Sequence, residues 1–346
     1  MSIAPGPALS SRPISRSAAR ASSTLRSRAW TVLRFLFGVS MLVYLQAVGI
    51  FDWKAVGGLA RFPAAALTAL ALLAGVLVLT SWRLCLLLRA HGIPITGRSV
   101  FKLNLIGAFF NTFLPGGVGG DAVKIYTARD YAPGKTVEFG TTAVLDRFVG
   151  LLGMATAPLL VAPFFPGLLL SPVVQGALAF AGSVAAGLLT LGAFAILQPH
   201  YFPWLVPWRG NKMLNRIMDT LARSHRSLGV LGRALAISWV GQAVLFAAMA
   251  AMLSAVSATG WEWEAAMLTP LGFLINCLPI TPGGLGVGEI GFDVLYAQAG
   301  IIRGAEALIA WRTLTTVLDV GGLYFFLQRR ATSGSTVLKL HFADAP

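Results

Sequence analysis

Two stretches of the chain repeat one unusual pattern. Residues 111–121 read NTFLPGGVGGD, and residues 276–289 read NCLPITPGGLGVGE. Both contain an asparagine, a Leu-Pro step, a Pro-Gly-Gly step, an aliphatic residue, a glycine and then an acid. Glycine permits positive φ and proline lacks a backbone donor, so each stretch is expected to interrupt a helix and to leave polar backbone groups unpaired. The pattern therefore predicts an internal repeat with a helix break in each copy.

The sequence around both copies is apolar. It is 56% hydrophobic and 12% charged, whereas an average soluble domain has about 25% charged residues. Two apolar segments, 100–115 and 264–281, are short and end in the repeated pattern. Six others can cross a hydrocarbon core of about 30 Å; they are 29–50, 63–88, 140–165, 173–198, 234–256 and 304–328. We expect an all-α integral membrane protein with about six transmembrane helices plus two re-entrant segments related as inverted repeats.

The positions of the cations predict how the chain is oriented. Most of the 27 Lys and Arg residues fall on one side of this topology, and only Lys54, Arg61 and Arg303 fall clearly on the other. The cation-rich side is cytoplasmic by the positive-inside rule, which places both termini there.

This topology predicts three regions. Residues 1–28 form a disordered basic cytoplasmic tail, 29–330 a polytopic membrane domain, and 331–346 a cytoplasmic C-terminal tail. The membrane domain holds repeat one (about 63–165), repeat two (about 234–328) and a cytoplasmic loop (199–233). Within that loop, the basic stretch 209–233 is either an amphipathic helix on the membrane surface or an ordinary basic loop helix.

Several function classes are not expected. The net charge of +14 follows from the membrane orientation, so nucleic acid is not an expected partner. Cys85 and Cys277 lie in apolar stretches without a Cys or His at ligand spacing, and the four histidines are scattered. We therefore expect no disulfide framework, no metal site and no other cofactor.

The repeated pattern also supplies the candidate substrate-binding residues. Asp121, Glu289, Arg147 and Arg312 are costly in hydrocarbon unless they are paired or face water, so they mark either a transport pathway or structural ion pairs. The set expected from the pattern is Asn111, Pro115, Gly116, Gly117, Gly119, Gly120, Asp121, Arg147, Asn276, Pro282, Gly283, Gly284, Gly286, Glu289 and Arg312.

These residues resemble those of a known family. Residues 111–121, the Asp146-Arg147 pair, and residues 282–289 with Arg312 downstream are similar to the transmembrane, flippase-type region of the lysylphosphatidylglycerol synthases and their stand-alone relatives. The resemblance covers about residues 30–330 and implies a protein that moves or handles lipid head groups across the cytoplasmic membrane. The resemblance adds Asp146 and Lys124 to the candidate substrate-binding residues. Lys124 stands where relatives often carry arginine, which keeps the charge but loses the bidentate fork for phosphate.

The resemblance also bears on chemistry. In the two-domain synthases a soluble C-terminal domain makes the aminoacylated lipid. Here the chain ends 16 residues past Arg330, so aminoacyl transfer by this chain is not expected.

We expect a lipid flippase or lipid-linked transporter of a bacterial or archaeal cytoplasmic membrane, handling a phospholipid or a polyprenyl or hopanoid-type lipid. Two alternatives stay open. A membrane-embedded transferase for lipid or glycolipid modification would need an acid/base pair or nucleophile that the sequence does not clearly present. An accessory scaffold would dock a peripheral lipid-modifying enzyme through residues 199–233. The expected partner is membrane lipid, while a peripheral enzyme and a homodimer stay open.

Overall fold

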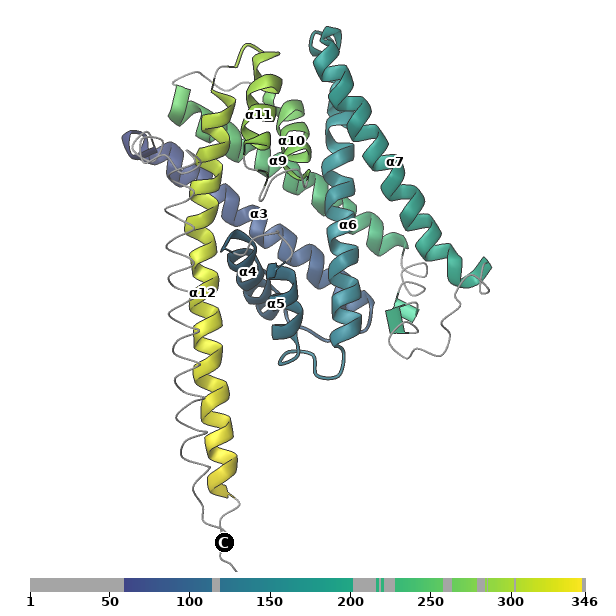
Figure 1. The fold of residues 1–346 in the computed structure, drawn as a ribbon, viewed down its shortest axis with the longest axis vertical. Coiled ribbons are helices and arrows are strands. Elements are labelled where there is room, and N and C mark those ends of the chain that lie inside the picture. Colours follow the sequence, from purple (N-terminus) through teal and green to yellow (C-terminus); the bar gives the residue numbers. More distant parts are fainter. Residues whose placement is uncertain are drawn as a thin grey trace, which may run out of the picture. The chain divides into compact units, whose positions relative to one another are not determined.

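The computed structural model is helical, with no strand in the residues that it describes (Figure 1). These residues are 59–113, 119–201, 216–217, 219–220, 228–257, 263–278, 284, 286–301 and 303–343. The predicted all-α membrane fold class is confirmed. The expected tail 1–28, the expected span 29–50 and most of the loop 199–233 lie outside the described residues.

Four described helices are long and apolar enough to cross a membrane, and they coincide with four of the six expected spans. They are α3 (Pro63–Ala90), α6 (Thr136–Val161), α7 (Pro172–Tyr201) and α9 (Leu228–Ser257). Proline opens α3 and α7, where its missing N–H has no helical partner to lose. Two short 3₁₀ turns, Ala162–Phe164 and Leu168–Leu170, connect α6 to α7.

The long helices carry large apolar side chains on their outer faces. Leu67 and Trp82 of α3 and Leu189 and Phe194 of α7 are all exposed. Exposed apolar faces of this extent suit a hydrocarbon environment better than water.

The sixth expected span, 304–328, lies in α12 (Gly304–Ala343). Arg312 and Asp319 fall in its apolar part and lower its mean hydropathy, because charged groups are unfavourable in hydrocarbon. By length and composition α12 is not one of the four helices above.

Two pairs of short helices lie beside the long ones: α4 (Gly97–Phe113) with α5 (Gly119–Ala128), and α10 (Ala265–Asn276) with α11 (Val287–Ala297). The members of each pair pack against each other, and we call the pairs the first and second hairpins. At 1.5 Å per residue, α4 is about 25 Å long and α10 about 18 Å, less than a core of about 30 Å. The membrane re-entry of these hairpins stays a prediction.

The prolines explain where the first helix of each hairpin ends. α4 ends two residues before Pro115, and α10 ends three residues before Pro279. A residue that precedes proline is disfavoured in the α region, so the helix ends at or before it.

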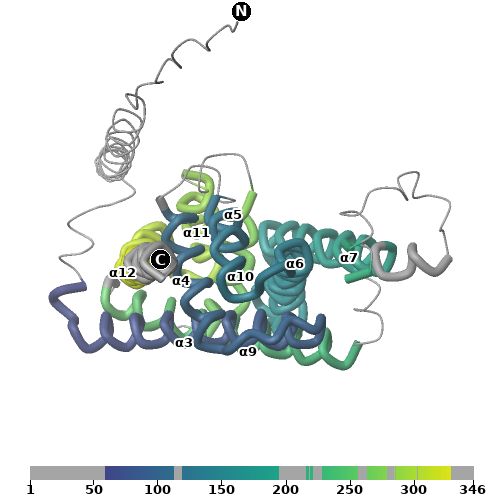
Figure 2. Tube along the Cα trace, turned by 90° about the horizontal axis from the view of Figure 1, so that it is seen from below, coloured from purple at the N-terminus to yellow at the C-terminus, as the bar shows by residue number. Residues whose placement is uncertain are grey.

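The helix contacts follow a regular scheme. α3 lies along α9, as Figure 2 also shows. α4 contacts α12 and α10 contacts α6, while α5 contacts α6 and α11 contacts α12. Exchanging α3, α4, α5 and α6 for α9, α10, α11 and α12 in that order leaves the α3–α9 contact unchanged. It turns α4–α12 into α10–α6 and α5–α6 into α11–α12. α7 lies outside the scheme and packs on α6 and α10.

Glycines allow close helix contact at the α4–α12 crossing and at the α6–α9 crossing. A Cβ on Gly322 of α12 would lie 2.1 Å from the carbonyl oxygen of Leu105 in α4. A Cβ on Gly153 of α6 would lie 2.5 Å from the Cβ of Ser238 in α9. Small residues allow such close packing where lipid provides no hydrophobic driving force between helices.

Candidate functional site

The first hairpin is closed by an asparagine and two glycines. Asn111 Oδ1 accepts a 2.9 Å hydrogen bond from the backbone N–H of Gly120 at the start of α5. The first turn of a helix has free N–H groups, so this amide acts as a cap supplied by the preceding helix. A Cβ on Gly120 would lie 2.0 Å from the carbonyl oxygen of Gly107. Glycine is therefore required at residue 120 for α4 and α5 to meet.

The second hairpin uses the same residue types. A Cβ on Gly288 would lie 2.2 Å from Oδ1 of Asn276, and one on Gly284 would lie 2.3 Å from the Asn276 carbonyl oxygen. Gly284 and Gly286 have φ of 71° and 79°, a region that favours glycine. The backbone N–H of Gly286 donates to Glu289 Oε2 at 2.7 Å, which fixes the glutamate at the start of α11.

Asp121 of the first hairpin lies between two cations. One of its carboxylate oxygens is 2.8 Å from Arg147 Nη2 of α6, and the other is 3.3 Å from Lys124 Nζ. Lys124 is buried and also donates to Asn104 Oδ1 at 3.3 Å. Asn104 in turn donates to Ser81 Oγ of α3 at 3.1 Å. A polar chain thus runs from Arg147 through the first hairpin to α3.

Glu289 of the second hairpin pairs with Arg312 of α12. Arg312 Nε lies 3.2 Å from Glu289 Oε1, and Nη2 donates to Asn276 Oδ1 at 2.8 Å. The same Nη2 lies 3.4 Å from the carbonyl oxygen of Gly284. One guanidinium therefore links α12 to Asn276 at the end of α10 and to Gly284 and Glu289 on the α11 side of the second hairpin.

The two arginines differ in exposure. The side chain of Arg147 is 53% exposed, whereas that of Arg312 is 17% exposed. Arg147 also lies within electrostatic range of Cys277, the residue after Asn276. The exposed guanidinium is therefore near residues of both hairpins.

Asp146 was expected in the same site as Arg147, and its direct partner in the structure is Arg83. It pairs with Arg83 of α3, whose Nε and Nη2 donate to the two carboxylate oxygens at 2.7 and 3.0 Å. Arg83 Nη1 also donates to Ser238 Oγ of α9 at 2.8 Å. Both charged side chains are about nine-tenths buried. Through Arg83, Asp146 therefore joins three long helices, and it also interacts electrostatically with Lys124 of the first hairpin.

Of the remaining expected residues, one is described by the structure and five are not. Gly119 begins α5. Pro115, Gly116, Gly117, Pro282 and Gly283 lie outside the described residues. Gly107, Asn104, Ser81 and Arg83 were not expected in or near the site. Arg83 carried a usable signal, since it is a lone cation in an apolar segment.

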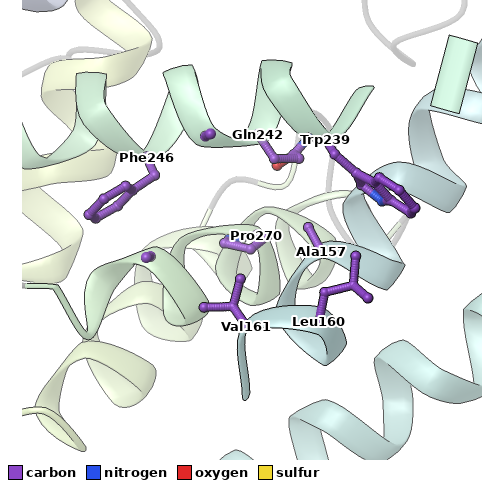
Figure 3. Close-up of a pocket in the computed structure, with 9 residues that line it drawn as sticks. Ala157, Leu160, Val161, Trp239, Gln242, Phe246 and Pro270 are labelled. Atoms are coloured by element: carbon purple, nitrogen blue, oxygen red, sulfur yellow. The ribbon is translucent and has the colours of Figure 1, made fainter. Parts of the chain in front are cut away.

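An apolar cleft of about 200 Å³ opens between α6, α9 and α10 (Figure 3). Trp239, Gln242 and Phe246 of α9 line it opposite Ala157 of α6, and Pro270 of α10 closes one side. Among the lining side chains, polar atoms belong to Trp239, whose Nε1 donates to Thr156 Oγ1 at 2.9 Å, and to Gln242, whose side-chain oxygen has no hydrogen-bond partner in the described structure. The cleft can accept an apolar chain more readily than a charged group.

Within the described residues, no group of three or more His, Cys, Asp or Glu side chains could hold a metal ion. The charged groups near the hairpins form pairs of opposite sign instead. Such an arrangement can bind and exchange an anion.

Long apolar helices and ion pairs at two helix hairpins define a polytopic helical membrane protein. The family model described as the lysylphosphatidylglycerol synthase TM region matches residues 31–320, and the chain belongs to this family. Membership indicates a membrane protein involved in lipid modification or transport. Comparisons with curated proteins and with solved structures found no match.

Proposed function

We propose that the protein is a lipid flippase or lipid-linked transporter that moves a lipid with an anionic head group across the membrane. The observation that carries the proposal is the state of Arg147, which is 53% exposed although it lies 2.8 Å from Asp121. An exposed guanidinium can form a bidentate pair with a phosphate while it stays in the protein. Family membership supports a lipid as the source of that phosphate.

Lys124 lowers the cost of this exchange. When Arg147 turns from Asp121 to a phosphate, Asp121 keeps Lys124 at 3.3 Å and is not left as an unpaired charge. Glu289 has Arg312 as its cation and no second one among the described side chains. We therefore assign head-group binding to the first hairpin and a structural role to the Glu289–Arg312 pair.

We further propose that the two halves are inverted repeats, with hairpins that enter the membrane from opposite sides. The exchangeable scheme of helix contacts supports this. So do matching contacts within the hairpins. The matched residues are Gly107 with Gly272, Asn111 with Asn276, Gly120 with Gly288, Asp121 with Glu289 and Arg147 with Arg312. Transporters built in this way place the substrate site between the repeats.

The cleft between α6, α9 and α10 is proposed to hold an acyl chain of the transported lipid. Its lining is apolar, and it borders α6, the helix that carries Arg147. Ala243 lines it and is exposed, so a larger side chain there would fill the cleft without entering the core.

The remaining features of the proposal follow the cation distribution and the resemblance. The protein would lie in a cytoplasmic membrane with both termini inside, and its substrate would be a phospholipid or a polyprenyl or hopanoid-type lipid. A peripheral lipid-modifying enzyme is a further candidate partner.

Transfer of fluorescent phosphatidylglycerol between the leaflets of liposomes tests the proposal. Replacing Arg147 with Gln should lower the initial rate about 10- to 100-fold, since a charge-assisted hydrogen bond is worth about 1.5–3 kcal/mol. Lysine at the same position should restore part of the rate. Replacing Arg98 with Gln, an exposed arginine on α4, is the matched control and should leave the rate unchanged.

The same assay tests the cleft. Replacing Ala243 with Phe should slow transfer, whereas replacing Ala186 with Phe, on the exposed face of α7, should not. Wild-type protein that moves no lipid, or an Arg147 variant as fast as wild type, would overturn the proposal. Chemical change of the lipid without transfer would favour the transferase alternative.

A further inference from the structure

Asp319 of α12 lies in the helix bundle without the cation partner that three other acids have in the described structure. Asp121, Asp146 and Glu289 each lie within 3.3 Å of a lysine or arginine nitrogen. Asp319 of α12 has one polar partner among the described side chains, the hydroxyl of Thr112 in α4, which donates to Oδ2 at 2.6 Å. An unpaired ionisable group within a membrane helix is a candidate functional group by default.

None of the charged groups on the helices around Asp319, Arg98 of α4 included, forms an ion pair with it in the described structure, and most of them have other partners. On α4, Lys102 lies over the ring of Phe325 at 5.4 Å. On α3, Arg83 pairs with Asp146 and Arg89 donates to the carbonyl of Ile95. The α11 acids are held by Arg312 and by the backbone N–H of Ala305, which donates to Asp293. Arg233 of α9 forms no ion pair with Asp319 in the described part of the chain.

The position of Asp319 on α12 connects the two hairpins through one helix. Asp319 follows Arg312 by seven residues, two helical turns or about 10 Å along the axis. Arg312 holds the second hairpin, and Asp319 holds Thr112 at the end of α4 in the first. α12 is thus bonded to both hairpins. The same interface is close-packed, because Gly322 meets the backbone of Leu105.

Protonation of Asp319 would weaken its hydrogen bond with the Thr112 hydroxyl without abolishing it. A threonine hydroxyl donates to a carboxylate and can accept from a carboxyl, so the Thr112 contact is available in both states. The bond to the ionised form is the stronger one, since it is charge-assisted. A carboxylate with one neutral partner in an apolar interface is also costly, and neutralisation removes that cost.

We propose that Asp319 is a proton-binding site that couples lipid movement to a proton. Ionised, Asp319 fastens the first hairpin to α12; protonated, it loosens the α4–α12 contact and lets the hairpin move. This inference rests on the proposed transport function. Asp319 lies seven residues after Arg312. The residue seven positions after Arg147, the matching arginine of the first half, is Met154, which cannot bind a proton.

The test is the steady-state distribution of fluorescent phosphatidylglycerol in liposomes under an imposed pH difference. This lipid carries a phosphodiester that stays ionised, so its own titration does not bias the result. With one coupled proton, a difference of about one pH unit should shift the wild-type leaflet ratio up to about tenfold, because one unit corresponds to about 1.36 kcal/mol. The Asp319→Asn variant should still transfer lipid, but the lipid should become equally distributed between the two leaflets despite the pH difference. Glu306→Gln, on the same helix, should behave as wild type.

A second measurement does not depend on transport. Infrared difference spectra between acid and alkaline pH should contain a carboxyl carbonyl band that Asp319→Asn lacks and Glu306→Gln retains. Wild-type transfer that ignores the gradient, or an Asn variant that still follows it, overturns proton coupling and leaves the transport proposal standing. Wild type without any transfer overturns both. Absence of the band overturns proton binding at Asp319.

Discussion

Arg147 and Arg312 hold matching positions in the sequence, yet their surroundings give them different tasks. Arg147 is half exposed and shares Asp121 with Lys124. Arg312 is largely buried and bonds to Glu289, Asn276 and the Gly284 carbonyl. An exposed pair contributes about 0–1 kcal/mol to stability, whereas breaking a buried one costs about 3–5 kcal/mol.

Replacing Arg312 with Gln should therefore destabilise the folded protein by about 3–5 kcal/mol, because Glu289 would remain buried without its cation. Replacing Arg147 with Gln should lower stability by about 1 kcal/mol or less. Thermal unfolding of the purified protein in detergent measures both changes. The double variant Glu289→Gln with Arg312→Gln should recover most of the lost stability; equal melting temperatures for the two single variants would contradict the assignment.

At the same scale, the sequence predicted which acids and arginines matter but not all of their partners. Asp121, Arg147, Glu289 and Arg312 could be recognised because each is charged within an apolar, repeated context. Asp146 was grouped with Arg147 because the adjacent pair resembles the family's pattern. Neighbours on an α-helix point about 100° apart, so Asp146 pairs with Arg83 of α3 while Arg147 pairs with Asp121 of α5.

The hairpins are the elements in which local chemistry determines structure most directly. The prolines and glycines were enough to predict that the segments ending near residues 115 and 281 are short. The sequence could not reveal which glycines touch another backbone. Gly107 and Gly272 each lie one turn before the hairpin asparagine and carry no mark that separates them from other helical glycines.

Adding a methyl group at the close contacts should open the hairpins. Gly120→Ala and Gly288→Ala place a Cβ 2.0 and 2.2 Å from another group, and overpacking costs about 1–3 kcal/mol. A matched control is Gly182→Ala in α7, where a Cβ meets nothing within 4 Å and helix propensity should improve by about 1 kcal/mol. Melting temperatures should fall for the first two variants and hold or rise for the third. A stable Gly120→Ala protein would show that α4 and α5 do not meet as described.

For the whole molecule, the crossed contacts could not be predicted from the sequence. Hydropathy identifies segments that enter a membrane, but lipid is as apolar as the helix faces and so does not select their partners. That α4 packs on α12 and α10 on α6 depends on shape at residues such as Gly322 and Leu105. The repeated pattern predicted two related halves, and the contact scheme agrees with that relation without fixing which side each hairpin faces.

Sidedness is the prediction that belongs to the entire chain. In Figure 1 the turn between α5 and α6 lies at the bottom and the turn between α11 and α12 lies at the top. The cation distribution places the first turn inside the cell and the second outside. Cysteines introduced at Pro133 and at Arg303, both exposed, should report this in a background with Cys85 and Cys277 replaced by alanine. A membrane-impermeant maleimide added to intact cells should label position 303 and leave position 133 unlabelled until the cells are broken. If the two hairpins enter the membrane from opposite faces, the turns after α5 and α11 lie on different sides. Labelling of both positions from outside would therefore contradict the opposite orientation of the hairpins.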